Sequence, residues 1–456
     1  MDTTGRRKWP NCPLRSPDLY SMSSPDLAVF WFRRDLRLED NHALFQALEG
    51  DLPVLPLFIF DRHILDRLED ENDARVLFIW QEVKALKRRL EKEHGSSMLI
   101  YHGKPEEVWH DIIAKYSVKA VYVNRDYDPY GRERDKSLYL RLKERGIAMR
   151  GYKDQVLFEK DEILKDDGSP YVVYTPYMKK YKSAMGKGEL PTYPSEKGGN
   201  YWQLEPLAMP ELEEMGFRQF DFQFPDREIN EALIRTYDQT RDIPAKKGTT
   251  RLSLHLRFGT ISLRRLATMA RKVNQKFFNE LIWRDFYQAI LYHYPSSMEA
   301  SFRPEYDGIA WENNAEHYQC WCEGKTGYPL VDAGMRELNS TGFMHNRVRM
   351  VTASFLCKHL LIDWRWGEAY FARKLLDYEA ASNVGGWQWA AGSGVDAAPY
   401  FRVFNPSRQQ ERFDPQEKYI RKWVPEYGTA EYPAPIVEHK WARERALDRY
   451  KKALKN

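Results

Sequence analysis

The stretch AVFWF, at residues 28–32, is the first of four short apolar runs in the N-terminal third of the chain. The other three lie at residues 54–60, 98–101 and 120–123. Between them are longer segments of helical period, of which 72–92 is the clearest, because its apolar residues share one broad face. Short buried strands that alternate with helices predict a parallel sheet covered on both sides. We therefore expect a Rossmann-like α/β domain over residues 28–155.

The segments that flank this domain look irregular. Residues 1–27 contain Pro10, Pro13, Pro17 and Pro25 and no amphipathic period, which predicts a flexible tail. Residues 182–225 are rich in Gly and Pro, so we expect 156–228 to be an interdomain linker. No Gly-x-Gly-x-x-Gly follows the first apolar run, so a standard dinucleotide site is not supported there.

Helical periods dominate the rest of the chain, and we expect an all-α domain over residues 229–456. The segments with the clearest period are 231–240, 262–273, 279–292, 333–339, 348–361 and 368–376. No internal repeat is evident.

Composition limits the class of protein. The 456 residues are 43% hydrophobic and 30% charged, with a mean hydropathy of −0.68, which is typical of globular rather than disordered or membrane proteins. No apolar stretch approaches the roughly 18 residues of a membrane-spanning helix. Four cysteines without a Cys-x-x-Cys pair indicate a reducing, cytoplasmic setting and give no reason to expect a metal site. The net charge of +4 does not demand a polyanionic partner.

Tryptophan is concentrated in the second half, where eight of the 14 residues fall between 280 and 423. Such clustering calls for a reason beyond packing.

The sequence KGTTRLS at residues 247–253 places a glycine, hydroxyls and an arginine ahead of an apolar helical run. Backbone amides and hydroxyls backed by a guanidinium can hold a phosphate. The alternative is an ordinary N-capped helix.

Glu280, Trp283 and Tyr287 share one face of a predicted helix. A carboxyl held against aromatic rings is desolvated, which raises its pKa and lets it donate a hydrogen bond near neutral pH. The alternative is a buried glutamate paired with an arginine of a neighbouring helix.

Asn346 and Met350 lie one helical turn apart, and a thioether beside an amide suits stacking on a planar ring. An ordinary core methionine is the alternative. Arg347 and Arg349 diverge, so one could meet a phosphate while the other pairs with an internal carboxylate.

The segment DYEAASNVGGWQWAAGSG at residues 377–394 is the densest in chemistry. Its double glycine weakens a helix but permits close backbone approach, as to a bound ring. A glycine-broken helix junction in a Trp-rich core is the alternative.

These motifs, together with VFWFRRDLRLEDN at 29–41 and WCEGKTGYP at 321–329, closely resemble the photolyase/cryptochrome family over roughly residues 28–440. Within the family the chain is most similar to class I cyclobutane pyrimidine dimer photolyases. The resemblance implies FAD in the helical domain and damaged DNA as the partner of a monomer, with no membrane contact.

The family's cofactor residues carry over motif by motif. The phosphates and ribose of FAD would contact Tyr237, Thr249, Thr250, Arg251, Leu252 and Ser253, and the flavin would be lined by Asp377, Tyr378, Glu379 and Asn383. Asn383 would face flavin N5, where a neutral amide tolerates a reduced, anionic flavin. Arg349 would pair with Asp377.

The implied reaction is light-driven cleavage of the cyclobutane ring by electron transfer from reduced FAD to a dimer flipped out of the duplex. Glu280 would hydrogen-bond the dimer, Trp283 and Met350 would pack on its bases, and Asn346 would complete the pocket. The candidates for contacts with the flanking DNA strand are Arg241, Arg347, Arg402 and Gln409. Trp387, Trp364 and Trp311 match the family's electron-transfer chain, whereas we expect Trp321, Trp366 and Trp389 to serve packing.

Three alternatives stay open within the family. Relatives that repair (6-4) photoproducts use a histidine pair near 346–350, where this chain has only His345, so cyclobutane dimers are favoured. A cryptochrome-type blue-light receptor is the second candidate, although the chain ends soon after Trp441. The places where folate-binding members have Cys-Lys and Glu hold Met298-Glu299 and Asp128 here, so a second antenna pigment could be folate, deazaflavin or flavin, or absent.

Overall fold

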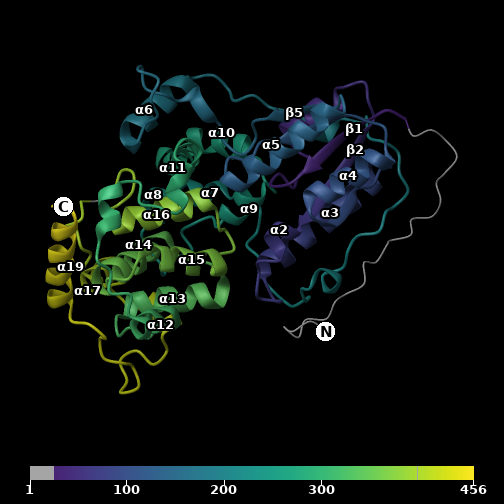
Figure 1. Ribbon diagram of the computed structural model, residues 1–456. Helices are drawn as coiled ribbons and strands as arrows, with labels where there is room; N and C mark the ends of the chain where they lie inside the picture. The colour runs from purple at the N-terminus through teal and green to yellow at the C-terminus, as the bar shows by residue number, and fades with distance from the viewer. Residues whose placement is uncertain (1–24, 398, 456) are drawn as a thin grey trace, which may run out of the picture.

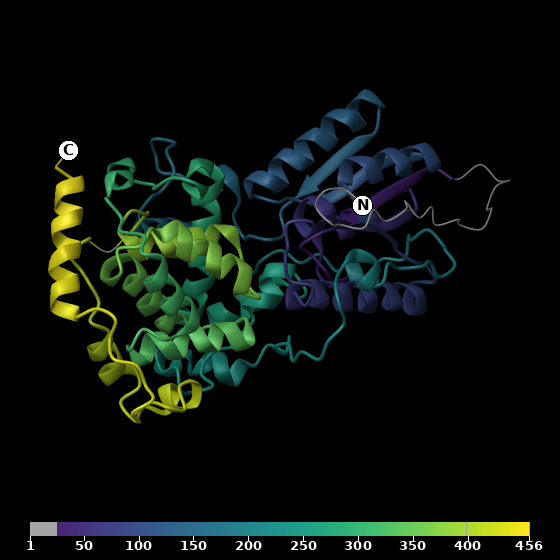
Figure 2. The ribbon, with the colours of Figure 1, turned by 60° about the horizontal axis from the view of Figure 1, so that its bottom comes forward.

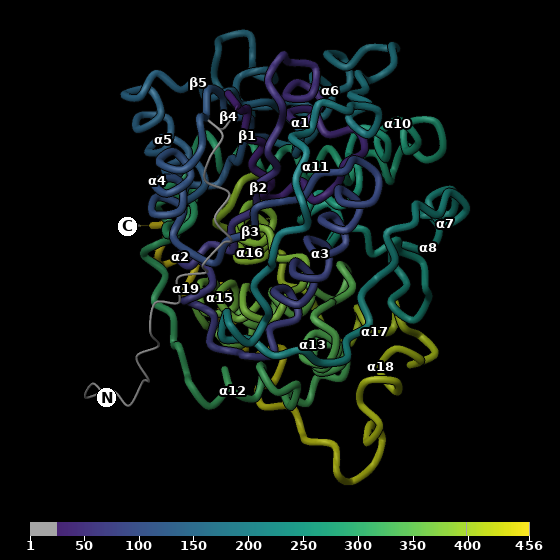
Figure 3. The backbone as a smooth tube through the Cα atoms, turned by 90° about the vertical axis from the view of Figure 1, so that its right-hand side faces the viewer, coloured from purple at the N-terminus to yellow at the C-terminus, as the bar shows by residue number. Residues whose placement is uncertain are grey.

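The protein, described here from a computed structural model that covers residues 25–397 and 399–455, has two domains that lie side by side (Figure 1). The N-terminal domain, purple to blue in the figure, contains the sheet, and the helical domain is mostly green. Figure 2 shows the same two lobes from another direction, and Figure 3 looks onto the α/β domain with the helical domain behind it.

Five parallel strands form the sheet, in the order β3-β2-β1-β4-β5. The strands are β1 (Leu27–Phe32), β2 (Val54–Asp61), β3 (Leu99–Gly103), β4 (Val118–Asn124) and β5 (Ala148–Tyr152). The connecting helices are α1 (His42–Leu48), α2 (Arg62–Leu65), α3 (Ala74–His94), α4 (Pro105–Lys115) and α5 (Pro129–Glu144).

Both faces of the sheet are buried, as its continuous apolar runs require. On β1, Phe30 packs in one core cluster with residues of α1 and α3, whereas Trp31 packs in another with residues of α4 and α5. The predicted α/β domain is therefore confirmed, with α1 and α3 on one face and α4 and α5 on the other.

Two details of the α/β domain differ from the sequence prediction. The edge strand β5 was missed because its sequence, AMRGY, has no apolar run and its residues are only partly buried. Leu27, assigned to the flexible tail, belongs to β1, where it pairs with Val118 and is fully buried. The rest of the predicted tail, up to residue 24, lies outside the described residues.

The segment 156–228 connects the two domains but also contributes to both. It contains α6 (Tyr174–Met185), which packs against α11 (Gln275–His293) of the helical domain, as Figure 1 shows near its top. Farther along, Tyr201, Leu212 and Phe217 join the core of the α/β domain. Single apolar side chains therefore anchor the connection to the α/β domain, although its sequence has no sustained helical or strand period.

Helices make up the second domain, as predicted. They are α7 (Glu231–Arg235), α8 (Tyr237–Thr240), α9 (Ser253–Phe258), α10 (Leu263–Val273), α11 (Gln275–His293), α12 (Ala315–Glu323), α13 (Pro329–Thr341), α14 (Asn346–Ser354), α15 (Trp364–Lys374), α16 (Ala380–Ala391), α17 (Pro406–Phe413), α18 (Lys418–Trp423) and α19 (His439–Ala453). A π-helical turn, Phe355–His359, continues α14. Among the described residues no helix has both the length and the apolar character to cross a bilayer.

The segment that follows β1 holds the domains together. Leu36 N donates to Phe258 O, and the Arg37 guanidinium donates to Gly259 O at 3.1 Å. Gly259 has a φ of 63°, and a Cβ there would collide with the backbone of Arg34 and Asp35. The charged run after the first strand is thus an interdomain contact.

Candidate functional site

A cavity of about 560 Å³ lies within the helical domain, in the size range of ligand pockets. It collects most of the predicted site residues: Tyr237, Arg241, Thr249, Thr250, Arg251, Leu252, Ser253, Glu280, Trp283, Asn346, Arg349, Met350, Asp377, Glu379, Asn383 and Trp387. Tyr378, Arg347, Arg402, Gln409, Trp311 and Trp364 do not line it.

The 249–253 segment forms one wall of the cavity in an irregular conformation. Arg251 adopts a φ of 54°, a left-handed value uncommon for a residue with a Cβ. Helix α9 starts at Ser253 after Leu252 and has no side-chain cap, so the alternative of an ordinary hydroxyl N-cap does not hold. Within the described chain neither the Thr249 nor the Ser253 hydroxyl has a hydrogen-bond partner, so both can meet a ligand.

The two glycines of α16 have different jobs. A Cβ on Gly385 would collide with the ring of Tyr287, so this glycine lets α16 pack closely on α11. A Cβ on Gly386, which lines the cavity, would meet no atom within 4 Å. The close approach predicted for a bound ring is therefore made to Tyr287 at Gly385, and Gly386 leaves room in the cavity.

Asn383 is buried and is held by a residue that the sequence did not single out. Its Nδ2 donates to the Glu368 carboxylate at 2.9 Å and to the Glu368 carbonyl at 3.2 Å. Burial raises the pKa of Glu368. Tyr378, expected to line the flavin site, instead donates its hydroxyl to Glu368 at 3.4 Å. No sequence spacing links α15 to α16, so pattern alone could not find Glu368.

Three ion pairs neutralise the two carboxylates beside Asn383. Arg349 pairs with Asp377 at 3.0 Å, as predicted. Glu379 pairs with Arg284 at 3.4 Å and more closely with Arg34, which comes from the α/β domain. Burial disfavours the charge on Glu379, but the surrounding guanidinium groups hold its pKa below the ordinary value.

Glu280 is paired with Arg241, which directly follows α8. This is the alternative considered from the sequence, an arginine partner from a neighbouring helix, and it replaces the expected carboxyl held against rings alone. The Glu280 side chain is 30% exposed, so it lies where the cavity reaches solvent.

Trp283 presents one face to a protein ring. Tyr174 of α6 stacks on it with a centroid distance of 3.6 Å and an interplanar angle of 6°. The Tyr174 hydroxyl donates to Asn279 O at 2.8 Å, which fixes its ring. Tyr174 lies in the predicted linker, and no sequence pattern connects it with Trp283.

The proposed DNA contacts outside the cavity differ in their environment. Arg347 pairs with Asp242 at 2.8 Å and lies over the Phe413 ring, so both Arg347 and Arg349 pair with carboxylates. Arg402 is exposed in the loop before α17, and Gln409 lies on α17. Their role in binding DNA stays a prediction.

Aromatic rings connect the cavity with the surface. The ring centroids of Trp387 and Trp321 are 6.0 Å apart, and those of Trp321 and Tyr318, which stack, are also 6.0 Å apart. The centroids of Tyr318 and Trp366 are 5.1 Å apart. Trp366 is 36% exposed. Trp321 and Trp366, expected only to pack, therefore form a ring chain that starts at the cavity.

The predicted electron-transfer residues Trp364 and Trp311 are placed differently. Trp364 is buried in the same core cluster as Trp387, and Trp311 packs at the edge of that cluster, 6.0 Å from the Tyr450 ring. Trp389 lines the cavity rather than serving packing alone. The electron-transfer assignment stays a prediction.

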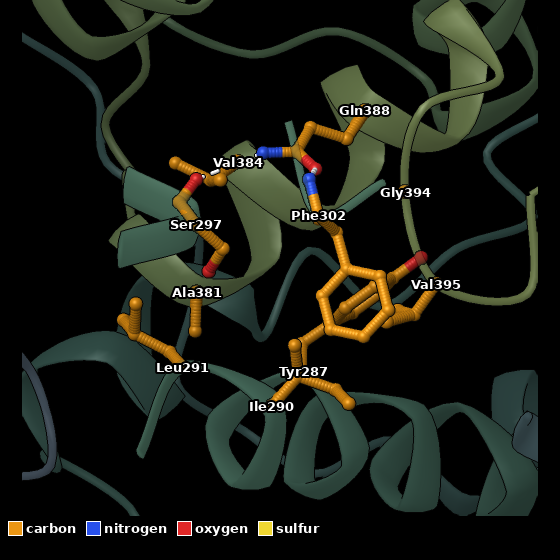
Figure 4. Close-up of a pocket in the computed structure, with 11 residues that line it drawn as sticks. Tyr287, Ile290, Leu291, Ser297, Phe302, Ala381, Val384, Gln388, Gly394 and Val395 are labelled. Atoms are coloured by element: carbon orange, nitrogen blue, oxygen red, sulfur yellow. Dashed lines mark hydrogen bonds between the residues drawn. The ribbon is translucent and has the colours of Figure 1, made fainter. Parts of the chain in front are cut away.

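The outer side of α16 is closed. Figure 4 shows Gln388 fastened to the 297–302 loop, where its amide accepts from Phe302 N and donates to Ser297 O, each at 2.8 Å. The void beside Gln388 has a volume of about 10 Å³, room for about one water molecule. This void is therefore too small for a larger ligand, whereas the 560 Å³ cavity on the other side of α16 has the space for one.

A second cavity, of about 590 Å³, lies where the ends of β4 and β5 face the end of α11. Arg132 places its guanidinium over the Tyr292 ring at 4.4 Å and donates to Tyr292 O. Met298, Glu299 and Asp128 are not among its lining residues in the described chain. Asp128 instead caps α5 by accepting from Gly131 N.

Comparison with known proteins gives consistent results over both domains. Residues 28–195 match the family model described as DNA photolyase, and residues 277–430 match the FAD binding domain of DNA photolyase. Deoxyribodipyrimidine photo-lyases of Synechococcus and Agrobacterium fabrum are 37% and 35% identical. Each alignment covers 92% of this chain, and 94% and 97% of the respective relative.

Solved structures agree with the sequence matches. The class III photolyase of Agrobacterium tumefaciens has a TM-score of 0.84 at 33% identity, covering 96% of this chain and all of that one. The cryptochrome of Synechocystis has a TM-score of 0.82 at 28% identity, covering 94% and 100%. A Sulfolobus tokodaii photolyase, described with two FAD molecules and a novel light-harvesting cofactor, has a TM-score of 0.80 at 35% identity, covering 93% and 99%.

The residues of the main cavity fit FAD. The unengaged hydroxyls of Thr249 and Ser253 can receive phosphate oxygens, and Gly386 leaves space for a flat ring beside α16. One guanidinium nitrogen of Arg257, which also lines the cavity, is buried without a hydrogen-bond partner. An anionic, planar ligand would meet the two hydroxyls, the space beside Gly386 and the positive charge of Arg257.

Proposed function

The chain belongs to the photolyase/cryptochrome family, and from this we propose that it repairs cyclobutane pyrimidine dimers in DNA with light. FAD is the cofactor of its helical domain. When bound, reduced FAD supplies, after absorbing blue light, the electron that opens the cyclobutane ring and is then returned.

One observation supports this proposal most directly: a single cavity is lined both by the predicted FAD residues and by the predicted dimer residues. Asn383 and Arg349 lie in the same cavity as Glu280, Trp283 and Met350. A lesion placed against Trp283 would thus share the cavity with the cofactor, which short-range electron transfer requires.

The side chains around the lesion would bind and orient it. Trp283, supported from behind by Tyr174, and Met350 would pack on the bases, and Asn346 would offer its amide to a base edge. Glu280 would hydrogen-bond the dimer and would then share its carboxylate with Arg241. Arg349 neutralises Asp377, and Asn383 is itself neutral, so neither residue would oppose the negative charge of a reduced flavin.

The flanking strand would meet Arg241, Arg347, Arg402 and Gln409. Cations facing phosphates give affinity that depends on salt and not on sequence. Arg347 would have to exchange its Asp242 partner for a phosphate, whereas Arg402 is exposed at the surface.

An antenna pigment in the second cavity is part of this proposal. The cavity combines the Tyr292 and Tyr139 rings with four cations and three acids, an excess of one positive charge that suits a flat, anionic pigment; the charged residues are Arg125, Arg132, Lys136 and Lys160, and Asp126, Glu133 and Asp135. The choice between folate, deazaflavin and flavin is open to direct extraction and chromatography of the purified protein.

The second candidate function is a cryptochrome-type receptor, which the similarity to the Synechocystis protein favours. A receptor would bind a partner protein in response to light and would not release a repaired DNA product.

The deciding experiment illuminates the flavin-reduced protein with blue light in the presence of two oligonucleotides, one with a cyclobutane dimer and one with a (6-4) photoproduct. We expect recovery of intact bases from the cyclobutane dimer only, and none in the dark. Repair of only the (6-4) lesion would contradict the proposed substrate. Absence of any repair, together with light-dependent protein binding, would favour the receptor.

A further inference from the structure

Arg257 is a cation in the main cavity that no sequence motif marked. It lies on α9, one helical turn after Ser253, so both side chains point to the same side of the helix, and both line the cavity. Its Nε donates to Tyr378 O at 2.5 Å, which fixes the plane of the guanidinium.

The guanidinium is buried but incompletely satisfied. Its Nη1 has no hydrogen-bond partner within the described residues. Glu379, a carboxylate of the same cavity, is already engaged by Arg34 and Arg284, and no carboxylate of the described chain comes within 4 Å of Arg257. Burial and the neighbouring Arg34 lower the pKa of Arg257 to about 10, as expected for a cation without its own anion.

Such an arrangement is costly in a protein without a ligand. A buried charge is normally paired and fully hydrogen-bonded, and an orphaned donor calls for an explanation. The other cavity cations differ. Arg241, Arg251, Arg284 and Arg349 each have a carboxylate partner, and Lys276 is exposed to solvent. Arg257 is therefore the buried cation whose counter-charge has to come from a ligand.

The resident cofactor offers two anionic parts, the diphosphate and the reduced flavin ring. The location beside Ser253 favours the first, because the 249–253 wall supplies the unengaged hydroxyls that suit phosphate oxygens. We infer that Arg257 binds the diphosphate of FAD through its guanidinium and contributes one positive charge against the two negative charges of the diphosphate, beside the unengaged hydroxyls of the 249–253 wall.

The inference rests on FAD being the cofactor and not on which lesion is repaired, so its test uses no repair assay. Purified holoprotein is diluted, and FAD release is followed by the rise of flavin fluorescence. The midpoint potential of the bound flavin is measured in parallel. In Arg257→Met we expect release at least tenfold faster, with the potential and the flavin absorption spectrum unchanged.

Controls separate charge from packing. Arg257→Lys keeps the cation, and we expect it to restore at least half of the lost retention. Arg235→Met removes an exposed arginine outside the cavity and should leave release unchanged. If Arg257→Met cannot be isolated with flavin, the Lys variant still reports a graded release rate.

Two results would overturn the inference. A shifted midpoint potential with unchanged release would show that the guanidinium meets the flavin ring instead. Unchanged release and unchanged potential would show that FAD leaves Arg257 uncompensated.

Discussion

Asn383 donates a hydrogen bond from Nδ2 to the Glu368 carboxylate, 2.9 Å away. The amide nitrogen is therefore committed to the protein. As a consequence the carbonyl oxygen Oδ1, which has no partner in the described chain, is the group that Asn383 offers to the cavity. The orientation of the amide is set by a buried acid on the neighbouring helix.

Removal of this acid should release the amide. In Glu368→Ala the Asn383 amide loses its hydrogen bond to the carboxylate and keeps only the longer one to the Glu368 carbonyl, which costs about 1–3 kcal/mol of stability. We expect a lower melting temperature of the holoprotein and a changed rate at which the reduced flavin oxidises in air. Glu368→Gln keeps an acceptor oxygen and should change both properties far less. Equal behaviour of the Ala variant and the wild type would contradict the orienting role.

Glu280 should matter for the lesion and not for the cofactor. Loss of a hydrogen bond from a charged group, worth about 1.5–3 kcal/mol, should lower the repair yield of Glu280→Ala about tenfold or more. Flavin content, read from its absorbance, should stay the same. Glu316→Ala, at an exposed position on α12, is the control. Loss of flavin in Glu280→Ala would show that the carboxylate belongs to the cofactor site.

Tyr174 should act through Trp283. A stacked aromatic pair contributes about 0.5–1.5 kcal/mol, so Tyr174→Leu should weaken binding of a dimer-containing oligonucleotide about two- to tenfold. Undamaged DNA should bind as before. Tyr171→Leu is the matched control, because the Tyr171 ring contacts Tyr177 and not Trp283. An equal loss in both variants would indicate general destabilisation of the helical core.

Two routes for photoreduction of the flavin can be separated by substitution. Trp387 lines the cavity and should be required by both, so Trp387→Phe should slow light-driven flavin reduction at least tenfold. Trp364→Phe and Trp321→Phe should each slow it only partly, and the double variant should match Trp387→Phe. Transient absorption with an external thiol measures the rates. If Trp364→Phe alone matches Trp387→Phe, the ring chain through Trp321 does not carry electrons.

Asp285 should make stability depend on pH. Burial raises its pKa to about 6 in the folded protein, above an unfolded value of about 3.9. Below about pH 4 both states are protonated and its contribution is fully present; as the pH rises towards 6 the unfolded state ionises first, and stability falls by up to about 3 kcal/mol. Asp285→Asn should flatten this part of the melting-temperature profile between pH 4 and 6. An unchanged slope would place the proton elsewhere.

Much of the fold could be predicted because burial leaves a period in the sequence. Strands buried on both faces, such as β1 and β2, must be apolar throughout, and the amphipathic α3 and α10 must repeat at helical spacing. Two parts of the fold leave no such period. The edge strand β5 is only partly buried, and the connection between the domains is anchored by single side chains rather than by a continuous face.

The candidate site divides in the same way. Residues within one motif, such as Thr249–Ser253 or Asp377–Asn383, could be predicted together. Their partners could not: Glu368 and Tyr174 reach the site from other helices, and tertiary packing alone places them there. Arg257 lies on the helix that begins at Ser253, but no motif shows that its guanidinium is left without a carboxylate. The sequence pattern likewise could not identify Arg241 as the arginine that pairs with Glu280.

The ion pair between Arg34 and Glu379 bears on how this protein can be engineered. Glu379 immediately precedes α16, the helix that carries Asn383 and Trp387, and the closer of its two arginine partners comes from the α/β domain. The helical domain therefore cannot be transferred to another protein without losing this contact. A chimera that joins it to a foreign N-terminal domain must also supply a guanidinium at the position of Arg34, or Glu379 will keep Arg284 as its one close counter-charge among the described residues.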